Sequence, residues 1–227
     1  MAGCKFQGWR ELVMRIWKEM EQRSEEWFRA RAGRITASNL KKILTPTGAM
    51  SKQSEDYVYE LCASCVRPDE VVFEGNLHTD RGNALEPVAR ELFVERTGFD
   101  VRQVGFVTHD DSPVLGCSPD GLVYRDGVPV AGLEIKCPLG KNHARYLYEG
   151  VLPSEYKAQV HGSMVVTGLD SWWFMSFNPG FEPFVIEVKR DGYTDKLGDA
   201  MVSFAKDYLA KMKVIIPVIT GKEGGVK

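Results

Sequence analysis

The sequence has no long hydrophobic run and almost no net charge. None of its apolar stretches approaches the roughly 18 residues of a membrane span. The apolar positions between Trp9 and Trp17 are interrupted by charged residues, so no signal-peptide core is expected there. We therefore expect a cytoplasmic protein with no membrane contact. The formal net charge of −2 gives no global electrostatic footprint of a protein that coats nucleic acid.

Cysteine and histidine are too scattered to build a disulfide framework or a zinc site. The five cysteines are odd in number, and reduced or buried thiols suit the lone Cys62-x-x-Cys65 pair better than a redox or metal pair. The histidines lack zinc spacing and suit polar surface or core roles; they are His78, His109, His143 and His161. No Ser-His-Asp order and no phosphate-binding glycine loop is visible.

One stretch, residues 116–136, carries most of the chemical information. The Asp-Gly pair at 126–127 lies between two apolar runs, and this predicts a type I′ hairpin, in which both central residues need φ > 0. The fold-back brings Asp120 beside Glu134. Glu134 and Lys136 are two positions apart and share one face of a strand. The sequence therefore predicts two carboxylates and an ammonium on one rigid platform.

Two carboxylates and a lysine suit a metal-dependent reaction at phosphate. Mg²⁺ binds through one or two carboxylates and keeps several waters. A neighbouring lysine can hold a water or stabilise phosphoryl charge. Each piece alone has a plainer explanation, since Ser-Pro-Asp-Gly at 118–121 is a good turn and Glu-x-Lys is common on solvated edge strands. The combination across one hairpin favours a site.

The hydrophobic periodicity predicts an α/β domain with a central mixed β-sheet flanked by helices. Helices are expected over residues 9–21, 24–33, 36–44, 54–66, 80–97, 152–167 and 193–212, with residues 67–79 irregular. Strands are expected over residues 101–108, 114–118, 122–124, 128–137, 171–177 and 184–188. We expect one domain over residues 1–227, with an N-terminal helical part (1–50), a core (80–190) and a flexible tail (221–227).

Polar residues on the flanking helices add to the hairpin. Glu86 borders the apolar stripe of helix 80–97 and can point toward a metal, although a glutamate in such a position is usually solvated. Gln159 lies on the helix that follows the hairpin. Basic residues gather near Trp27, at Arg29, Arg31, Arg34, Lys41 and Lys42. They suit a nucleic-acid end site, although from the charges alone a solvated amphipathic face is the favoured explanation.

In this order the residues resemble the PD-(D/E)xK nuclease core. The matching positions are Glu86, Ser118-Pro119-Asp120-Gly121, Glu134-Ile135-Lys136 and Gln159. More narrowly, the chain is similar to the phage lambda exonuclease and YqaJ-type viral recombinase group. The similarity rests on WFRARAGRITASNLKKI (27–43), RGNALEPVARELF (81–93) and AQVHGSMVVT (158–167), and it covers about residues 24–190. His161 departs from the group, where a second glutamine is common.

The resemblance implies a restriction-endonuclease-like fold and an alkaline-type, two-metal deoxyribonuclease. Asp120 would bridge two Mg²⁺ ions, for which Mn²⁺ would substitute. Glu134 and the Ile135 carbonyl would bind one ion and Glu86 the other, while Lys136 would position the attacking water. By the same resemblance a 5′-phosphate pocket would be formed by Arg31, Ser38, Ser118 and Gln159.

Enzymes of this group digest the 5′ strand of linear double-stranded DNA to mononucleotides. They leave 3′ tails for recombination beside a single-strand annealing protein, and they form a ring-shaped homotrimer. The resemblance thus implies a phage, prophage or bacterial host as source. Two alternatives stay open: a non-catalytic DNA-end-binding module, and a sequence-specific endonuclease of the same fold. The intact set of Asp120, Glu134 and Lys136 favours an enzyme.

Overall fold

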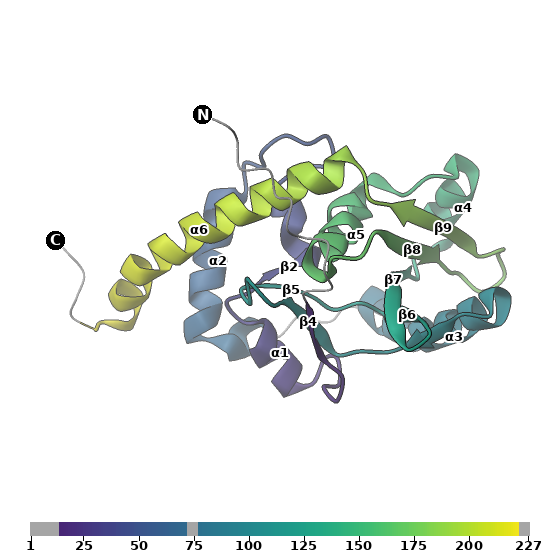
Figure 1. Cartoon of the computed structure of the whole chain (residues 1–227), viewed down its shortest axis with the longest axis horizontal. Coiled ribbons are helices and arrows are strands. Elements are labelled where there is room, and N and C mark those ends of the chain that lie inside the picture. The colour runs from purple at the N-terminus through teal and green to yellow at the C-terminus, as the bar shows by residue number, and fades with distance from the viewer. Residues whose placement is uncertain (1–13, 72–76, 223–227) are drawn as a thin grey trace.

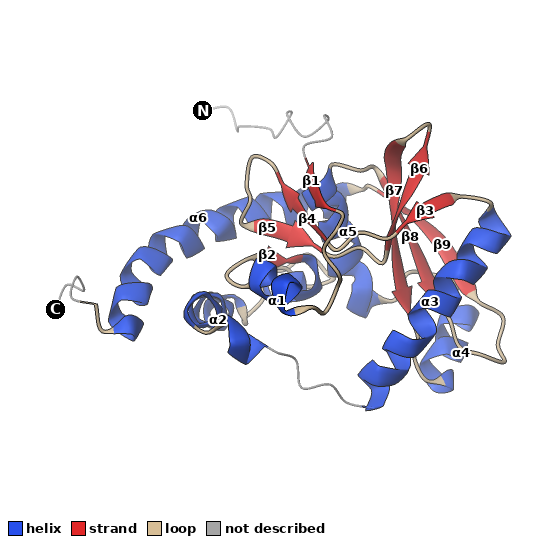
Figure 2. Cartoon of the chain, turned by 90° about the horizontal axis from the view of Figure 1, so that it is seen from below, coloured by secondary structure: helices blue, strands red, loops and turns tan. Residues whose placement is uncertain are grey.

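The chain folds into two mixed β-sheets with helices around and between them (Figures 1 and 2). The computed structural model describes residues 14–71 and 77–222. Within these ranges no helix is long and apolar enough to cross a membrane. The α/β class with mixed sheets flanked by helices is confirmed. The prediction of one central sheet is wrong, because the strands divide between two sheets.

The five-stranded sheet is built on the predicted hairpin. Its strands, in spatial order, are β3 (Asp100–Arg102), β6 (Gly121–Arg125), β7 (Val128–Lys136), β8 (Ser171–Ser176) and β9 (Phe184–Lys189). The central strand β7 pairs antiparallel with β6 and parallel with β8. A parallel pair needs a crossover, and here α4 (Gly140–Glu149) and α5 (Ser154–Thr167) supply it. Helix α4 was not predicted.

The Asp-Gly hairpin turn is confirmed. Asp126 has φ +51° and Gly127 has φ +78°, the two positive values that a type I′ turn requires. Strands β6 and β7 pair from Arg125 opposite Val128 to Gly121 opposite Leu133. The register places the residues that precede β6 against the end of β7, where the carboxylates lie.

The four-stranded sheet contains segments that were predicted otherwise. Its order is β1 (Met14–Trp17), β4 (Phe106–His109), β5 (Leu115–Cys117) and β2 (Ile35–Thr36). The helix predicted over residues 9–21 is wrong where the structure describes it, because residues 14–17 pair antiparallel with β4. The single strand predicted over 101–108 is also wrong. It breaks before Gly105, where an added Cβ would lie 2.1 Å from the Met20 carbonyl oxygen, and its halves join different sheets.

The remaining helices mostly follow the predicted periodicity. They are α1 (Glu25–Arg31), η1 (Ala37–Lys42), α2 (Ser54–Val66), η2 (Pro68–Val71), α3 (Leu77–Thr97) and α6 (Gly192–Thr220). Ser24 caps α1, as expected, by accepting a hydrogen bond from Trp27 N at 3.2 Å. The third helix is 3₁₀ rather than α, and Thr36 makes no side-chain cap bond.

Three predicted boundaries shift. Residues 67–79 are not uniformly irregular, since η2 occupies their start and α3 begins at Leu77; residues 72–76 lie outside the described ranges. Helix α6 continues to Thr220 instead of ending at residue 212, and Gly221 terminates it with φ +65°. Most of the tail predicted to be flexible falls outside the described ranges.

Helix α5 is the buried centre of the fold. Nearly all of it beyond Tyr156 is inaccessible to solvent, and it contacts both sheets, η1 and α6 (Figure 2). At Gly162 an added Cβ would lie 1.9 Å from the Leu40 side chain, so only glycine permits this close packing. Because α5 faces both sheets, its polar residue Gln159 is directed at the end of β7.

A second apolar cluster fixes α3 on the other face of the five-stranded sheet. Ala89 and Phe93 of α3 pack with Leu133 of β7 and Met175 of β8. Val88, on the same helix, faces away from this cluster and is 50% exposed. This packing brings the N-terminal half of α3, and with it Glu86, to the hairpin.

Candidate active site

The chain changes sheet at residues 118–120. Strand β5 of the four-stranded sheet ends at Cys117, and β6 of the five-stranded sheet begins at Gly121. Ser118 is therefore held by residues of the N-terminal part. Asp120 is held by β7, because the Asp120 amide donates to the Leu133 carbonyl at 3.0 Å.

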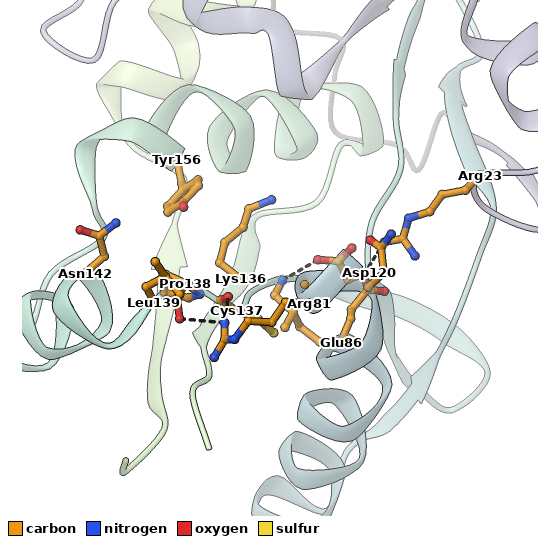
Figure 3. Close-up of a pocket in the computed structure, with 13 residues that line it drawn as sticks. Arg23, Arg81, Glu86, Asp120, Lys136, Cys137, Pro138, Leu139, Asn142 and Tyr156 are labelled. Carbon is orange, nitrogen blue, oxygen red and sulfur yellow. Dashed lines mark hydrogen bonds and ion pairs between the residues drawn. The ribbon is translucent and has the colours of Figure 1, made fainter. Parts of the chain in front are cut away.

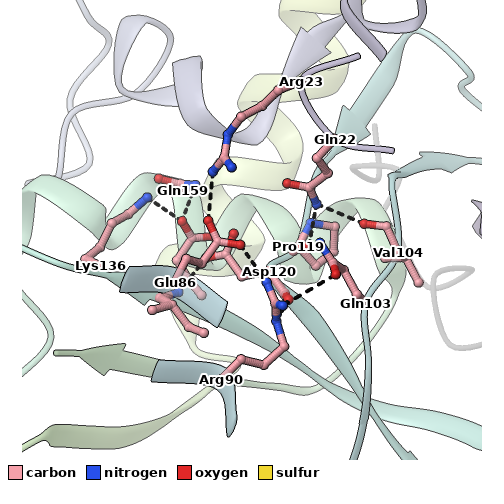
Figure 4. Close-up of polar contacts among 12 residues, drawn as sticks. Gln22, Arg23, Glu86, Arg90, Gln103, Val104, Pro119, Asp120, Lys136 and Gln159 are labelled. Carbon is pink, nitrogen blue, oxygen red and sulfur yellow. Dashed lines mark hydrogen bonds and ion pairs between the residues drawn. The ribbon is translucent and has the colours of Figure 1, made fainter. Parts of the chain in front are cut away.

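Three of the predicted residues meet on the hairpin, and Figure 4 labels two of them, Asp120 and Lys136. Asp120 is buried, and its Oδ2 accepts a hydrogen bond from Ile135 N at 2.6 Å. Glu134 is 2% exposed, and its Oε1 lies 2.5 Å from Lys136 Nζ. Gln159 Nε2 donates to the same oxygen at 2.6 Å. The structure thus brings Asp120, Glu134 and Lys136 together, with Gln159 against Glu134.

Burial and repulsion between the carboxylates disfavour the ionised forms of Asp120 and Glu134. The pKa of Asp120 is raised well above its usual value, first by burial and then by the charges of Glu134 and Glu86. Burial also raises the pKa of Glu134, although Lys136 and Gln159 offset part of that effect. Burial alone would lower the pKa of Lys136, but the two carboxylates outweigh it and raise the value. An added cation would stabilise the cluster.

Glu86 reaches the site from α3 between two arginines. Its Oε1 accepts from Arg90 Nη2 at 2.6 Å and its Oε2 from Arg23 Nη2 at 2.8 Å. Arg90 also donates to the Asp120 carbonyl at 2.7 Å, which ties α3 to the hairpin. Neither arginine was predicted from the sequence. Arg90 could have been predicted to pair with Glu86, because residues four positions apart on a helix are neighbours.

A cavity of about 620 Å³ opens over these groups (Figure 3). Its lining includes Asp120, Glu86 and Lys136, with Arg81 and Asn142 at other points of the wall. The volume lies within the range of about 300–1,000 Å³ typical of small-molecule sites. A nucleotide-sized ligand therefore has room directly over the carboxylates of Asp120 and Glu86.

The donor set fits a hard divalent cation that keeps its waters. Among the side chains that the structure describes, no three of His, Cys, Asp or Glu converge as a ready-made metal cage. Mg²⁺ does not need one, because one or two carboxylates and several waters satisfy it. Asp120 and Glu134, which are buried oxygen donors of raised pKa, meet that description. Ile135, the predicted carbonyl donor, also lines the cavity.

A second polar cluster surrounds Arg31 of α1. Arg31 Nη1 donates to Ser118 Oγ at 2.9 Å and Nη2 to Ser38 Oγ at 3.2 Å. The guanidinium carbon lies 4.2 Å from the centre of the Trp27 ring, whose Nε1 also donates to Ser118 Oγ. Of the four residues predicted to hold a phosphate, Arg31, Ser38 and Ser118 lie together. The fourth, Gln159, is hydrogen-bonded to Glu134 instead.

Arg31 is a half-buried cation that forms no ion pair with a carboxylate among the described residues. Burial lowers its pKa to about 10, although nearby groups, among them Glu134, act in the opposite direction. Other members of the basic group differ, since Arg29 forms an exposed ion pair with Glu25 and Lys42 pairs with Glu60. The solvated-face explanation therefore suits Arg29, whereas Arg31 is held against Ser118, Ser38 and Trp27.

Four of the cysteines and histidines that the structure describes, Cys62, Cys65, His143 and His161, do not line this cavity. Cys62 is buried and Cys65 is exposed, and both are free thiols. His143 Nδ1 lies 2.7 Å from Ser176 Oγ, and His161 Nδ1 lies 2.7 Å from Thr194 Oγ1. Cys4 lies outside the described ranges, and the side chain of His78 is not among the described side chains.

Comparisons with known proteins agree with this geometry. Residues 26–170 match the YqaJ-like viral recombinase domain. An alkaline exonuclease from Laribacter hongkongensis, LHK-Exo, superimposes with a TM-score of 0.72 and 29% identity over 88% of this chain and 97% of that one. Its complex with dAMP gives the same TM-score and coverages with 30% identity.

Two further comparisons are more distant. A phage related exonuclease from Haemophilus somnus 129PT shares the fold, with a TM-score of 0.55 and 16% identity over 79% of this chain and 95% of that one. An uncharacterized protein, R354, of Acanthamoeba polyphaga mimivirus is 24% identical over 166 residues, which is 69% of this chain and 29% of the viral protein. The chain thus spans under a third of that relative. With its domain match over more than half of its length, the chain belongs to the YqaJ-like viral recombinase family.

Proposed function

We propose that this chain is a Mg²⁺-dependent 5′→3′ exonuclease that digests one strand of linear double-stranded DNA to mononucleotides. The 3′ single-stranded tails that remain would serve recombination by annealing. The observation that carries the proposal is the buried cluster of Asp120, Glu134 and Lys136 at a nucleotide-sized cavity. Membership of the family and the likeness to an alkaline exonuclease support it.

The proposed roles follow from the contacts. Asp120 and Glu134, with the Ile135 carbonyl, would hold one cation, and Asp120 with Glu86 a second. When bound, such a pair of divalent ions stabilises the attacking and leaving oxygens of an in-line displacement. Mn²⁺ is expected to substitute for Mg²⁺.

Lys136 would act as a donor rather than as a base. Its neighbours Glu134 and Asp120 raise its pKa, so the ammonium keeps its proton. A protonated Lys136 can orient a water by a hydrogen bond and stabilise charge that develops on the phosphoryl oxygens. In the reaction the water oxygen bonds to phosphorus while the bond from phosphorus to the 3′ oxygen breaks.

Recognition of the 5′ end would fall to the Arg31 cluster. A planar guanidinium grips a phosphate through two parallel hydrogen bonds. In the free chain, Nη1 and Nη2 of Arg31 donate to the hydroxyls of Ser118 and Ser38. A terminal phosphate would accept hydrogen bonds from the guanidinium and from both hydroxyls. Gln159, predicted as a fourth member, is bonded to Glu134, and we now propose that it orients that carboxylate.

The proposed assembly is a ring-shaped homotrimer that works with a single-strand annealing protein. A closed ring would retain a mildly acidic chain on DNA without a large basic surface. Light scattering should then give three times the chain mass of 25.5 kDa. A mass of one chain at micromolar concentration would reject the ring.

The test is the loss of digestion when either hairpin carboxylate is removed. Asp120→Ala and Glu134→Ala should abolish Mg²⁺-dependent release of mononucleotides from 5′-phosphorylated linear duplex, with unchanged circular dichroism. Ca²⁺ should bind without supporting turnover, because its longer bonds misplace the reacting oxygens. The matched control is Asp100→Ala, an exposed carboxylate of the same sheet bonded to Arg102, which should retain full activity. Wild-type turnover by either hairpin variant would contradict the proposal.

A further inference from the structure

Arg23 has a backbone conformation that arginine rarely adopts. Its φ is +72°, and in residues 14–71 and 77–222 only one other non-glycine residue, Asp126, has a positive φ. Asp126 is explained by the hairpin turn that it forms. Arginine has no short polar side chain to support a left-handed backbone locally, so its surroundings must hold it there.

The neighbours of Arg23 fix this conformation from both sides (Figure 4). Gln22 Nε2 donates to the Val104 carbonyl at 2.9 Å and to the Pro119 carbonyl at 2.8 Å. Ser24 is committed to the cap of α1. The segment is therefore attached directly beside Asp120, and the Arg23 side chain points across to Glu86, where it lines the cavity (Figure 3).

The two arginines on Glu86 are not equivalent. The Arg90 side chain is 14% exposed and also donates to the Asp120 carbonyl, so it is part of the scaffold. The Arg23 side chain is 45% exposed, and the contact that the structure describes for it is one hydrogen bond to Oε2 of Glu86. Arg90 alone balances the charge of Glu86. Arg23 thus brings a second positive charge to the mouth of the cavity, in an exposed ion pair that is weak and easily exchanged.

We propose that Arg23 is a substrate-binding residue that takes a phosphate of the DNA backbone at the mouth of the cavity. The inference rests on the proposed function. When DNA enters, the guanidinium exchanges Glu86 for a phosphate, to which it offers two parallel donors. Glu86 stays paired with Arg90, and its Oε2 becomes free. The left-handed backbone at Arg23 directs its guanidinium toward the incoming strand. Of the two arginines that pair with Glu86, Arg23 is the exposed one.

The experiment measures equilibrium binding without turnover. A 5′-phosphorylated linear duplex, fluorescently labelled at its distal end, is titrated with protein in EDTA, and the anisotropy is followed over a series of salt concentrations. Arg23→Gly suits a positive φ and removes the charge, so its Tm should match or exceed that of the wild type. Arg23→Asn, also tolerated in the left-handed region, is a second neutral variant.

Both neutral variants should bind the duplex about tenfold more weakly at low salt. Because one phosphate contact is lost, the slope of log Kobs against log[salt] should fall in magnitude by about 0.9. Arg23→Lys keeps the charge and should retain the wild-type slope. The control Arg29→Ala removes the same charge from the neighbouring helix, where Arg29 pairs with Glu25 away from the cavity lining, and should leave the slope unchanged.

Each other result overturns the inference. If Arg23→Gly and Arg23→Asn keep the wild-type Kd and salt slope but digest DNA slowly, Arg23 only orients Glu86. If Arg23→Lys behaves like the neutral variants, the charge is not what DNA contacts. If the wild-type protein binds no duplex, the proposed function is contradicted as well. If the wild type binds and the Arg23 variants bind equally well, only the inference about Arg23 is contradicted.

Discussion

At the scale of single residues, Asp120 has the least favourable surroundings in the site. It is buried, it faces Glu134 and Glu86, and Lys136 only partly offsets their charges. A carboxylate kept in such a place destabilises the free fold when it is ionised. This cost is consistent with a position selected for binding a cation rather than for stability.

The first prediction concerns this cost. Asp120→Asn retains an acceptor for Ile135 N and removes the charge, so it should raise the Tm of the protein in EDTA. The folded pKa of Asp120 lies above the unfolded value of about 3.9. Below the unfolded pKa, Asp120 is protonated in both the folded and the unfolded state, so its charge does not reduce stability. As the pH rises through the folded pKa, ionisation destabilises the wild type alone.

The gain in Tm from Asp120→Asn should therefore grow as the pH is raised from about 4, by roughly 2–4 °C for each ~1 kcal/mol of unfolding free energy. Thermal denaturation of both proteins across this range is the measurement. Asp100→Asn is the control, because a hydrogen bond from Arg102 lowers the pKa of Asp100 and no growing gain is expected. A gain that shrinks as the pH rises would show that Asp120 is not destabilised by its charge.

The second prediction concerns Arg31. If its cluster holds the terminal phosphate, 5′-phosphorylated duplex should be digested faster than 5′-hydroxyl duplex, by roughly tenfold or more for a charge-assisted contact. Arg31→Ala should erase most of that preference, and Arg31→Lys, which keeps the charge but not the planar fork, should retain part of it. Initial rates on the two substrates decide the matter. Equal rates for the wild type would leave Arg31 a purely structural role with Ser118 and Trp27.

At the scale of elements, the β6–β7 hairpin is the part that sequence reasoning predicts best. Its turn is a local property of Asp126 and Gly127, and its alternation fixes which side chains share a face. The hairpin alone was enough to bring Asp120, Glu134 and Lys136 together. Local chemistry therefore determines the centre of the candidate site.

The third prediction tests the turn. At Gly127 an added Cβ would meet nothing within 4 Å, so Gly127→Ala isolates the cost of φ +78°. We expect a loss of about 1–2 kcal/mol in the free energy of unfolding. Gly192→Ala is the matched control, since Gly192 also has open space and its φ is not positive; it should change stability by less than about 0.5 kcal/mol. Urea denaturation that gave equal values for both would contradict the turn assignment.

The elements that sequence reasoning missed depend on distant partners. Residues 14–17 belong to a segment whose apolar spacing is helical, yet they form a strand because β4, about ninety positions away, offers a free edge. The segment 101–108 reads as one strand until Gly105 packs on Met20 and divides it. Helix α4 buries only His143 and Tyr146, so its apolar stripe is too thin to detect.

The same limit applies to residues of the site. Arg23 and Arg90 read as solvated charges, and nothing local relates Arg23 to Glu86, 63 positions away. Gln159 was placed correctly on a helix beside the hairpin, but its partner is Glu134, which only the packing of α5 reveals. Residue type and spacing predicted the donors, and tertiary structure determined their partners.

At the scale of the whole molecule, the site lies where the two sheets meet. The segment 118–120 leaves one sheet with Ser118 in the Arg31 cluster and enters the other with Asp120 beside Glu134. Helix α5, packed against both sheets, holds this junction (Figure 2). The proposed phosphate pocket and the proposed metal site are thus two residues apart in sequence, which suits an enzyme that cleaves one nucleotide from an end.

One gel distinguishes an exonuclease from an endonuclease and from a DNA-end-binding module. A linear duplex labelled at its phosphorylated 5′ end and a closed circular duplex are incubated with the protein, each with Mg²⁺ or with EDTA. We predict release of the label as a mononucleotide from the linear duplex with Mg²⁺ only, and an intact circle throughout. Cleavage of the circle would indicate an endonuclease. If the linear duplex is bound but not digested, the chain is a DNA-end-binding module and the account is contradicted.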